Sequence, residues 1–237
     1  MKMRILSAFL AATVLIFTQC KKDDATPTPT VTTDYAPMTS GSSFDYKVTD
    51  SAGATTATYT MTSTGRDTTF SGNTKSYRIF KLNDSTGSLD YYSKSGNSYY
   101  HFTTLPLIGK YDELYLKDNG NVNDSWVINL PAIDSIPGAP IAGPYTPTVT
   151  YSIAEVGSSK TVEGKNYTDV IKIRMDISVA VTVPLLGVQH LAIGGRDSYY
   201  SKGVGLIQEN YNINVNVFGA SYFRFISNRY LTNYVIK

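Results

Sequence analysis

The stretch YNINVNV, residues 211–217, decides the fold class of this chain. Its apolar side chains alternate with three asparagines and fall at Tyr211, Ile213, Val215 and Val217. Successive side chains of a β-strand point to opposite faces, so a period of two predicts a strand with one buried and one polar face.

The same alternation recurs on both sides of this stretch, at residues 44–49 and again at residues 171–178. The second run continues through an apolar break, Pro184–Gly187, into residues 188–193, which predicts a long β-hairpin with an apolar tip. Gly- and Asn-containing turns separate the other runs, and a long helical period is lacking after residue 20. We therefore predict an all-β fold.

An internal repeat indicates how the strands are organised. Residues 58–61 (TYTM) align with residues 150–153 (TYSI), and Gly65 and Gly72 align with Gly157 and Gly164 at the same offset. Residues 91–94 and 199–202 both read YYSK. The matching segments thus occur in the same order in both copies, and the larger offset of the second match shows that the second copy is longer. Chance similarity in a Thr/Tyr-rich chain is the alternative. The repeat predicts two β-meander halves, about 41–110 and 111–237, that pair into one antiparallel sheet curved into a half-barrel or barrel.

The composition excludes several classes of function. The 237 residues include one Cys and two His, which rules out a disulfide framework and leaves little for a metal site. A formal net charge of +2 is too small for a nucleic-acid-binding protein. The sequence also has no nucleophile elbow, no zinc-protease motif and no phosphate-binding loop. We expect no catalytic residues, no cofactor, no metal and no nucleic acid, and hence a protein that is not an enzyme.

The N-terminus reads as a secretion signal. Lys2 and Arg4 precede an apolar run, residues 5–17, that is too short to span a bilayer. The run ends at Phe17–Cys20 (FTQC), which resembles the bacterial lipobox, in which the Cys thiol is lipidated. An ordinary signal peptide with a stray Cys is the alternative. The interpretation predicts a cleaved signal peptide over 1–19 and lipidation, including palmitate, at Cys20, so that the N-terminal lipid joins the protein to a membrane.

The residues after Cys20 form a tether. Lys21–Asp24 (KKDD) resembles the export signal of outer-membrane lipoproteins from Bacteroidota-type bacteria, and residues 25–40 are rich in Thr and Pro. Residues 161–171 and 199–207, with Asp124–Trp126 ahead of them, are also similar to uncharacterised lipoproteins of that kind. The resemblance implies an outer-membrane location, with the cell surface favoured over the periplasmic face. We predict a tether over 20–40 and a single β domain over 41–237.

Three apolar loops carrying Pro or Gly are candidates for the rim of a cavity on such a scaffold. The residues proposed to bind a hydrophobic ligand are Leu105, Leu107, Ile108, Leu185 and Leu186. The alternative is that these loops only cover the end of the barrel.

Tyrosine doublets offer a second hypothesis. In Tyr91–Tyr92, Tyr99–Tyr100 and Tyr199–Tyr200 one ring should face each side of the sheet, and an outward ring could stack on a sugar. Cross-strand aromatic pairing is the alternative. The sequence thus favours a non-enzymatic, lipid-anchored envelope protein that binds a lipid-like molecule or acts as an envelope accessory. A glycan-binding module or a structural subunit of an envelope complex are the rival hypotheses.

Overall fold

The computed structural model describes residues 32–105, 109–136, 143–217 and 220–237. The expected signal peptide and Cys20 therefore lie outside the described residues. The described chain is all-β, as predicted, and no helix within it is long and apolar enough to cross a membrane. Its twelve strands are β1 (Ser43–Thr49), β2 (Thr55–Thr68), β3 (Tyr77–Leu82), β4 (Leu89–Ser95), β5 (Ser98–Leu105), β6 (Gly109–Lys117), β7 (Ser125–Asn129), β8 (Tyr145–Val162), β9 (Lys165–Val183), β10 (Gly187–Ser201), β11 (Gly205–Val217) and β12 (Ala220–Val235).

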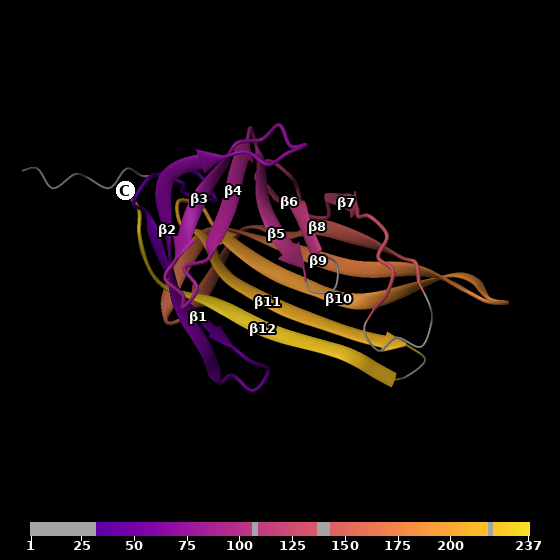
Figure 1. The fold of residues 1–237 in the computed structure, drawn as a ribbon. Helices are drawn as coiled ribbons and strands as arrows, with labels where there is room; N and C mark the ends of the chain where they lie inside the picture. The colour runs from indigo at the N-terminus through magenta and orange to yellow at the C-terminus, as the bar shows by residue number, and fades with distance from the viewer. Residues whose placement is uncertain (1–31, 106–108, 137–142, 218–219) are drawn as a thin grey trace, which may run out of the picture.

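The strands form one antiparallel sheet that nearly closes into a barrel (Figure 1). Each strand pairs with its sequence neighbour, except that β6 and β7 are the two edges and β1 pairs with β12. The β1–β12 pairing runs from Ser43–Val235 to Thr49–Asn228 and joins the two ends of the chain. The expectation of an antiparallel sheet curved into a half-barrel or barrel is confirmed.

The sequence repeat has a structural counterpart. Residues 58–61 and 150–153 lie in β2 and β8. The first YYSK motif lies in β4 and the second at the end of β10, so each pair occupies the same place in a six-strand half. Gly65 and Gly157 both have positive φ beside register shifts of β2 and β8. The division expected at residue 110 falls inside β6, and the first six strands end at Lys117.

The two halves differ in strand length. β9 and β10 have 19 and 15 residues, whereas their counterparts β3 and β4 have 6 and 7. The long strands of the second half extend well beyond the first half at the right of Figure 1. The predicted long hairpin is confirmed, with its turn closed by a hydrogen bond from Leu186 N to Val183 O at 3.1 Å.

The N-terminal segment, Asp34–Met38, lies at the opposite end and packs on the barrel, although its composition is that of the tether. Asp34 O accepts a hydrogen bond from Gly203 N at 2.8 Å. Met38 O accepts from Ser63 Oγ at 2.9 Å and from Arg78 Nη1 at 2.6 Å. The C-terminus lies at the same end, where Lys237 N donates to Ser42 Oγ at 3.1 Å. The described chain thus begins and ends at one end of the barrel (Figure 1).

Candidate functional site

The barrel interior holds six charged residues in which carboxylates and cations alternate along a chain of contacts. We call these residues the interior charge network. The network crosses from the strands of the first half to those of the second and contains Asp90, His101, Glu113, Arg196, Glu209 and Arg229. Three carboxylates face three cations, so the network has no net charge when all six are ionised. Charges inside a protein are stable only when they are paired in this way.

Glu113 and Arg196 form the central pair. Glu113 is fully buried in β6, and Arg196 is buried in β10. The guanidinium contacts both carboxylate oxygens: Arg196 Nη2 bonds Oε1, and Nη1 lies 3.5 Å from Oε2. Tyr151 Oη also donates to Glu113 Oε1 at 3.0 Å, and Arg196 Nη1 donates to Tyr211 Oη at 2.9 Å. No backbone pairing links β6 to β10. The Glu113–Arg196 pair is therefore a side-chain connection between these two strands across the interior.

His101 connects Glu113 to Asp90. Its Nε2 lies 2.5 Å from Asp90 Oδ1, and its Nδ1 lies 3.6 Å from Glu113 Oε2. The ring stacks on Tyr92, with the two centroids 4.3 Å apart and the planes 1° from parallel. Two carboxylates therefore face the two nitrogens of one buried imidazole, an arrangement that favours the imidazolium.

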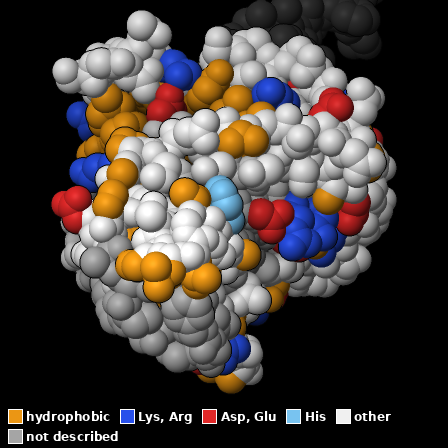
Figure 2. Space-filling view, turned by 90° about the vertical axis from the view of Figure 1, so that its right-hand side faces the viewer, with side chains coloured by type: hydrophobic (Ala, Val, Ile, Leu, Met, Phe, Trp, Pro, Cys, Tyr) orange, Lys and Arg blue, Asp and Glu red, His pale blue; other side chains and the backbone are white. Residues whose placement is uncertain are grey.

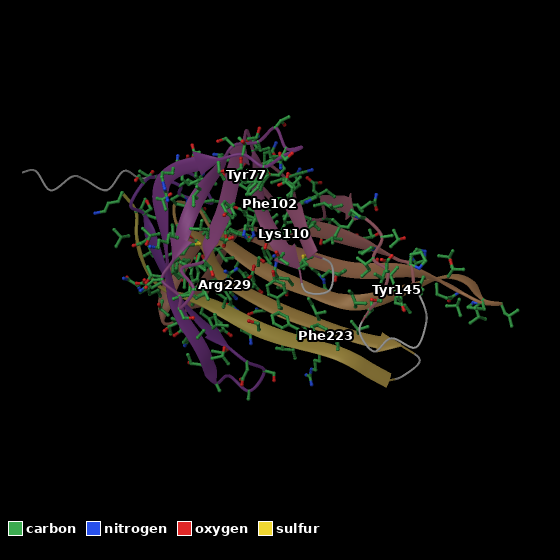
Figure 3. All side chains as sticks on the ribbon, viewed as in Figure 1. Tyr77, Phe102, Lys110, Tyr145, Phe223 and Arg229 are labelled. Atoms are coloured by element: carbon green, nitrogen blue, oxygen red, sulfur yellow. The ribbon has the colours of Figure 1, made fainter. Side chains whose placement is uncertain are left out.

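Glu209 and Arg229 complete the network on the β11–β12 side. Arg229 Nη2 bonds Glu209 Oε1, and Arg196 Nε lies 3.5 Å from Glu209 Oε2. Arg229, labelled in Figure 3, also donates from Nη1 to Tyr59 Oη at 2.8 Å. The network thus ends at Tyr59 in β2, a strand of the first half.

The environment shifts the pKa of the ionisable groups toward their charged forms. Burial would raise the pKa of Glu113, but Arg196 and His101 outweigh burial and lower this pKa to about 2. Burial would lower the pKa of His101, but Asp90 and Glu113 outweigh it and raise this pKa to about 9. The pKa of Asp90 is lowered despite its burial, because of His101. All three groups are therefore charged at neutral pH.

A small cavity adjoins the network. It measures about 40 Å³, and its lining includes His101, Glu113, Arg196, Glu209 and Arg229. The N-terminal segment closes it on one side, with Tyr35, Ala36, Pro37 and Met38 in the lining. A cavity of this size has room for a few water molecules and is smaller than the pockets that usually hold small ligands.

The centre of the network has the properties of a structural ion pair. Catalytic groups need to reach a substrate, whereas the central Glu113–Arg196 pair is buried on both sides. Within the described ranges, no group of three His, Cys, Asp or Glu residues is placed to hold a metal ion. What the network does chemically is pair charges that join distant strands.

The predicted ligand-binding residues do not meet at this cavity. Leu105 is buried in the hydrophobic core, while Leu185 and Leu186 are exposed at the tip of the β9–β10 hairpin. Leu107 and Ile108 lie outside the described residues. Leu105, Leu185 and Leu186 do not contribute to the lining of the interior cavity.

The tyrosine doublets divide between the two faces as their spacing predicts. Tyr92 and Tyr200 line the interior cavity, and Tyr99 is buried in the core. The other three rings are covered by neighbouring side chains: Tyr91 by Phe70, with centroids 5.0 Å apart, Tyr100 by Lys75 and Tyr199 by Lys160. Phe70 itself stacks on Phe102, labelled in Figure 3, at 3.9 Å. The outward rings of the doublets therefore each contact a neighbouring side chain on the described surface.

The charge network was missed in the sequence, although one signal was available. Glu113 lies between Tyr111 and Tyr115 in a strand, and Glu209 lies between Ile207 and Tyr211. Alternation assigns each glutamate to the buried face, where an unpaired carboxylate would be unstable. Buried partners of opposite charge could thus have been inferred, but not which residues they are.

Comparisons with known proteins give a limited result. No protein-family model matches the chain, and no curated protein matches it in sequence. Among solved structures, the chain is similar to a candidate lipoprotein from Parabacteroides distasonis, with a TM-score of 0.46 and 10% identity over 86% of this chain and 99% of that one. It is also similar to a candidate exported protein with a YmcC-like fold from Bacteroides fragilis, with a TM-score of 0.41 and 8% identity over 84% and 97%. At these values the likeness assigns neither a family nor an activity to this chain.

Proposed function

We propose that this chain is a non-enzymatic, lipid-anchored protein of the bacterial cell envelope that acts as an envelope accessory. The observation that carries the proposal is the position of Cys20. The only cysteine of the chain follows a basic and an apolar region at the place where lipidation requires a thiol. Two or more acyl chains at this thiol and the new N-terminus would anchor the protein durably.

The geometry of the body fits an anchor at this point. The described chain begins at Thr32, at the end of the barrel that also carries the C-terminus (Figure 1). The twelve residues from 20 to 31 span at most roughly 37 Å if they are polyproline-like. The barrel would therefore be held near the membrane by one end, with the long β9–β10 hairpin at the other.

The interior favours an accessory over a carrier of hydrophobic molecules. Ligand pockets usually measure roughly 300–1,000 Å³, whereas the interior cavity measures about 40 Å³ and is lined in part by charged groups. The ion pairs that cross it hold the strands together, and a lipid entering there would have to separate them. The outer membrane and the cell surface remain the location that we propose from Lys21–Asp24.

The test is membrane fractionation and labelling with a radioactive or alkyne-tagged fatty acid in a bacterium that processes lipoproteins. The expected result is that the native chain takes up label and stays with membranes, while Cys20→Ser does neither. A matched control moves the thiol along the tether, in the double variant Cys20→Ser/Thr28→Cys, which should also remain unlabelled. Equal labelling of the native chain and the double variant would contradict the proposal, as would a Cys20→Ser chain that stays in the membrane fraction after signal cleavage.

A further inference from the structure

The tip of the β9–β10 hairpin is a two-stranded ribbon that projects from the sheet. Pairing of β8 with β9 ends at Tyr145–Val181, and pairing of β10 with β11 ends at Gly194–Ile213. Residues 182–192 therefore pair only within the hairpin, beyond a register shift between Ala192 and Gly194. The ribbon projects at the right of Figure 1, at the opposite end of the molecule from the N-terminal segment.

The ribbon carries the most exposed large hydrophobic side chains of the described chain. Leu185 is 105% exposed, Leu186 62% and Val188 60%. Figure 2 views the molecule from this end and shows hydrophobic side chains at the surface of this face. Leu185 has a φ of +68°, a conformation that is unfavourable for a leucine and that Gly or Asn would adopt more easily. A strained backbone thus holds an apolar side chain in solvent.

The ribbon is also free of charge over a long distance. From Ile177 to Gly195, nineteen residues counting 177 to 195, the sequence has no Asp, Glu, Lys or Arg. The nearest charge toward the body along β9 is Asp176, eight residues before Pro184, or about 26 Å along a strand. A lipid interface accepts amphipathic elements to a depth of about 5–10 Å. The tip could therefore enter that far without bringing a charge into the membrane.

Several backbone polar groups at the turn have partners within the ribbon. Gln189 Nε2 donates to Leu186 O at 2.9 Å and to Val188 O at 3.2 Å. Leu186 N donates to Val183 O. Backbone groups that leave water for lipid need internal hydrogen bonds, because lipid offers none. A tip that satisfies its own carbonyls through a neighbouring side chain is suited to that environment.

We propose that the tip of the β9–β10 ribbon, Val183–Val188, inserts into the interface of a lipid bilayer. The occupant is lipid rather than a protein groove because the tip is a narrow projection whose most exposed side chains are apolar and whose Leu186 and Val188 carbonyls accept hydrogen bonds from Gln189. Since the ribbon contains no Lys or Arg, insertion depends on apolar burial and not on anionic headgroups. The inference does not rest on the Cys20 anchor.

The experiment uses the chain from residue 20 onward, which contains every described residue, with Cys20→Ser so that no lipid is attached. Leu186→Trp places a fluorescent reporter at the tip, while the natural Trp126 is buried and reports the fold. Vesicles of neutral phosphatidylcholine should shift the tip emission to shorter wavelength, and brominated acyl chains should quench it. Val156→Trp, at an exposed apolar position of β8, is the control and should show neither change.

Partitioning of the same unlipidated chain, without the reporter, gives the quantitative test. Leu185→Asp and Leu186→Asp should each weaken binding to vesicles on the order of tenfold, whereas Val156→Asp should leave it unchanged. Absence of an emission shift with vesicles would overturn the proposal. So would binding that requires anionic lipid, or a shift that grows with protein concentration and needs no lipid, which would assign the tip to self-association. Because no lipid anchor is present, each of these outcomes is independent of the test on Cys20.

Discussion

The indole Nε1 of Trp126 in β7 donates a hydrogen bond of 2.7 Å to the carbonyl oxygen of Leu114 in β6. These two strands are the edges of the sheet, and they are not paired with each other. Trp126 also stacks on Tyr151, with centroids 5.5 Å apart and planes 5° from parallel. A side chain therefore bridges the gap in the barrel where a backbone ladder is missing.

Trp126→Phe removes this bridge and keeps an aromatic ring on Tyr151. The Leu114 carbonyl loses its partner, so we expect the free energy of unfolding to fall by about 1–2 kcal/mol. Urea unfolding followed by circular dichroism measures this, since the only Trp is lost. Val127→Ala changes an exposed residue of the same strand and should cost less than about 0.5 kcal/mol. Equal effects of the two substitutions would show that the bridge does not stabilise the barrel.

Glu113→Gln tests the interior charge network. The substitution keeps the shape of the side chain but leaves Arg196 without its central carboxylate, so we expect a loss of about 3–5 kcal/mol in unfolding free energy. Glu163→Gln makes the same chemical change at a surface pair, where Lys47 Nζ lies 2.7 Å from the carboxylate. This control substitution should lower the free energy of unfolding by less than about 1 kcal/mol. A small effect of Glu113→Gln in chemical unfolding would mean that Arg196 is balanced by Glu209 alone.

The fold was predictable from sequence to a greater extent than the interior. Strand alternation is local, so residues 211–217 and the hairpin around Pro184–Gly187 are visible in the sequence, and the repeat indicates two similar halves. The Glu113–Arg196 pair is not local: its members are 83 positions apart. It exists because the sheet curves until β6 faces β10, which no short stretch of sequence encodes. The sequence marked Leu185 and Leu186 as candidates for binding a hydrophobic ligand. Their place on a projecting ribbon follows from where pairing with β8 and β11 ends, which the sequence does not show.

The charge network also predicts how stability depends on pH. His101 has a pKa raised from 6.5 to about 9, so its contribution is complete below pH 6.5 and is lost as the pH rises through 9. Glu113 has a pKa lowered from 4.5 to about 2, so its contribution is complete above pH 4.5 and is lost as the pH falls through 2. These groups together predict the highest stability between about pH 4.5 and 6.5.

Urea unfolding at a series of pH values up to 9 checks this profile, since at that pH only about a tenth of each tyrosine is ionised in the unfolded chain. His101→Gln should lower stability at pH 6 and flatten the decline between pH 6.5 and 9. A native chain whose stability is constant over that interval would contradict the protonated state of His101. The imidazole signals in NMR give the pKa directly and separate this result from a general loss of structure.

Gly195→Ala tests the close approach of strands where the ribbon leaves the sheet. A Cβ at Gly195 would lie 1.9 Å from Met175 O, a backbone atom of the neighbouring strand β9, so β9 and β10 would have to separate. We expect a loss of more than about 2 kcal/mol in unfolding free energy, at the level of overpacked cores. Gly187→Ala lies at the ribbon tip with a φ of +72° and open space around it, so only backbone strain of about 1–2 kcal/mol applies. Because the two glycines lie on the same strand, a larger loss at Gly187 than at Gly195 would show that strand spacing at the base of the ribbon is not what requires glycine.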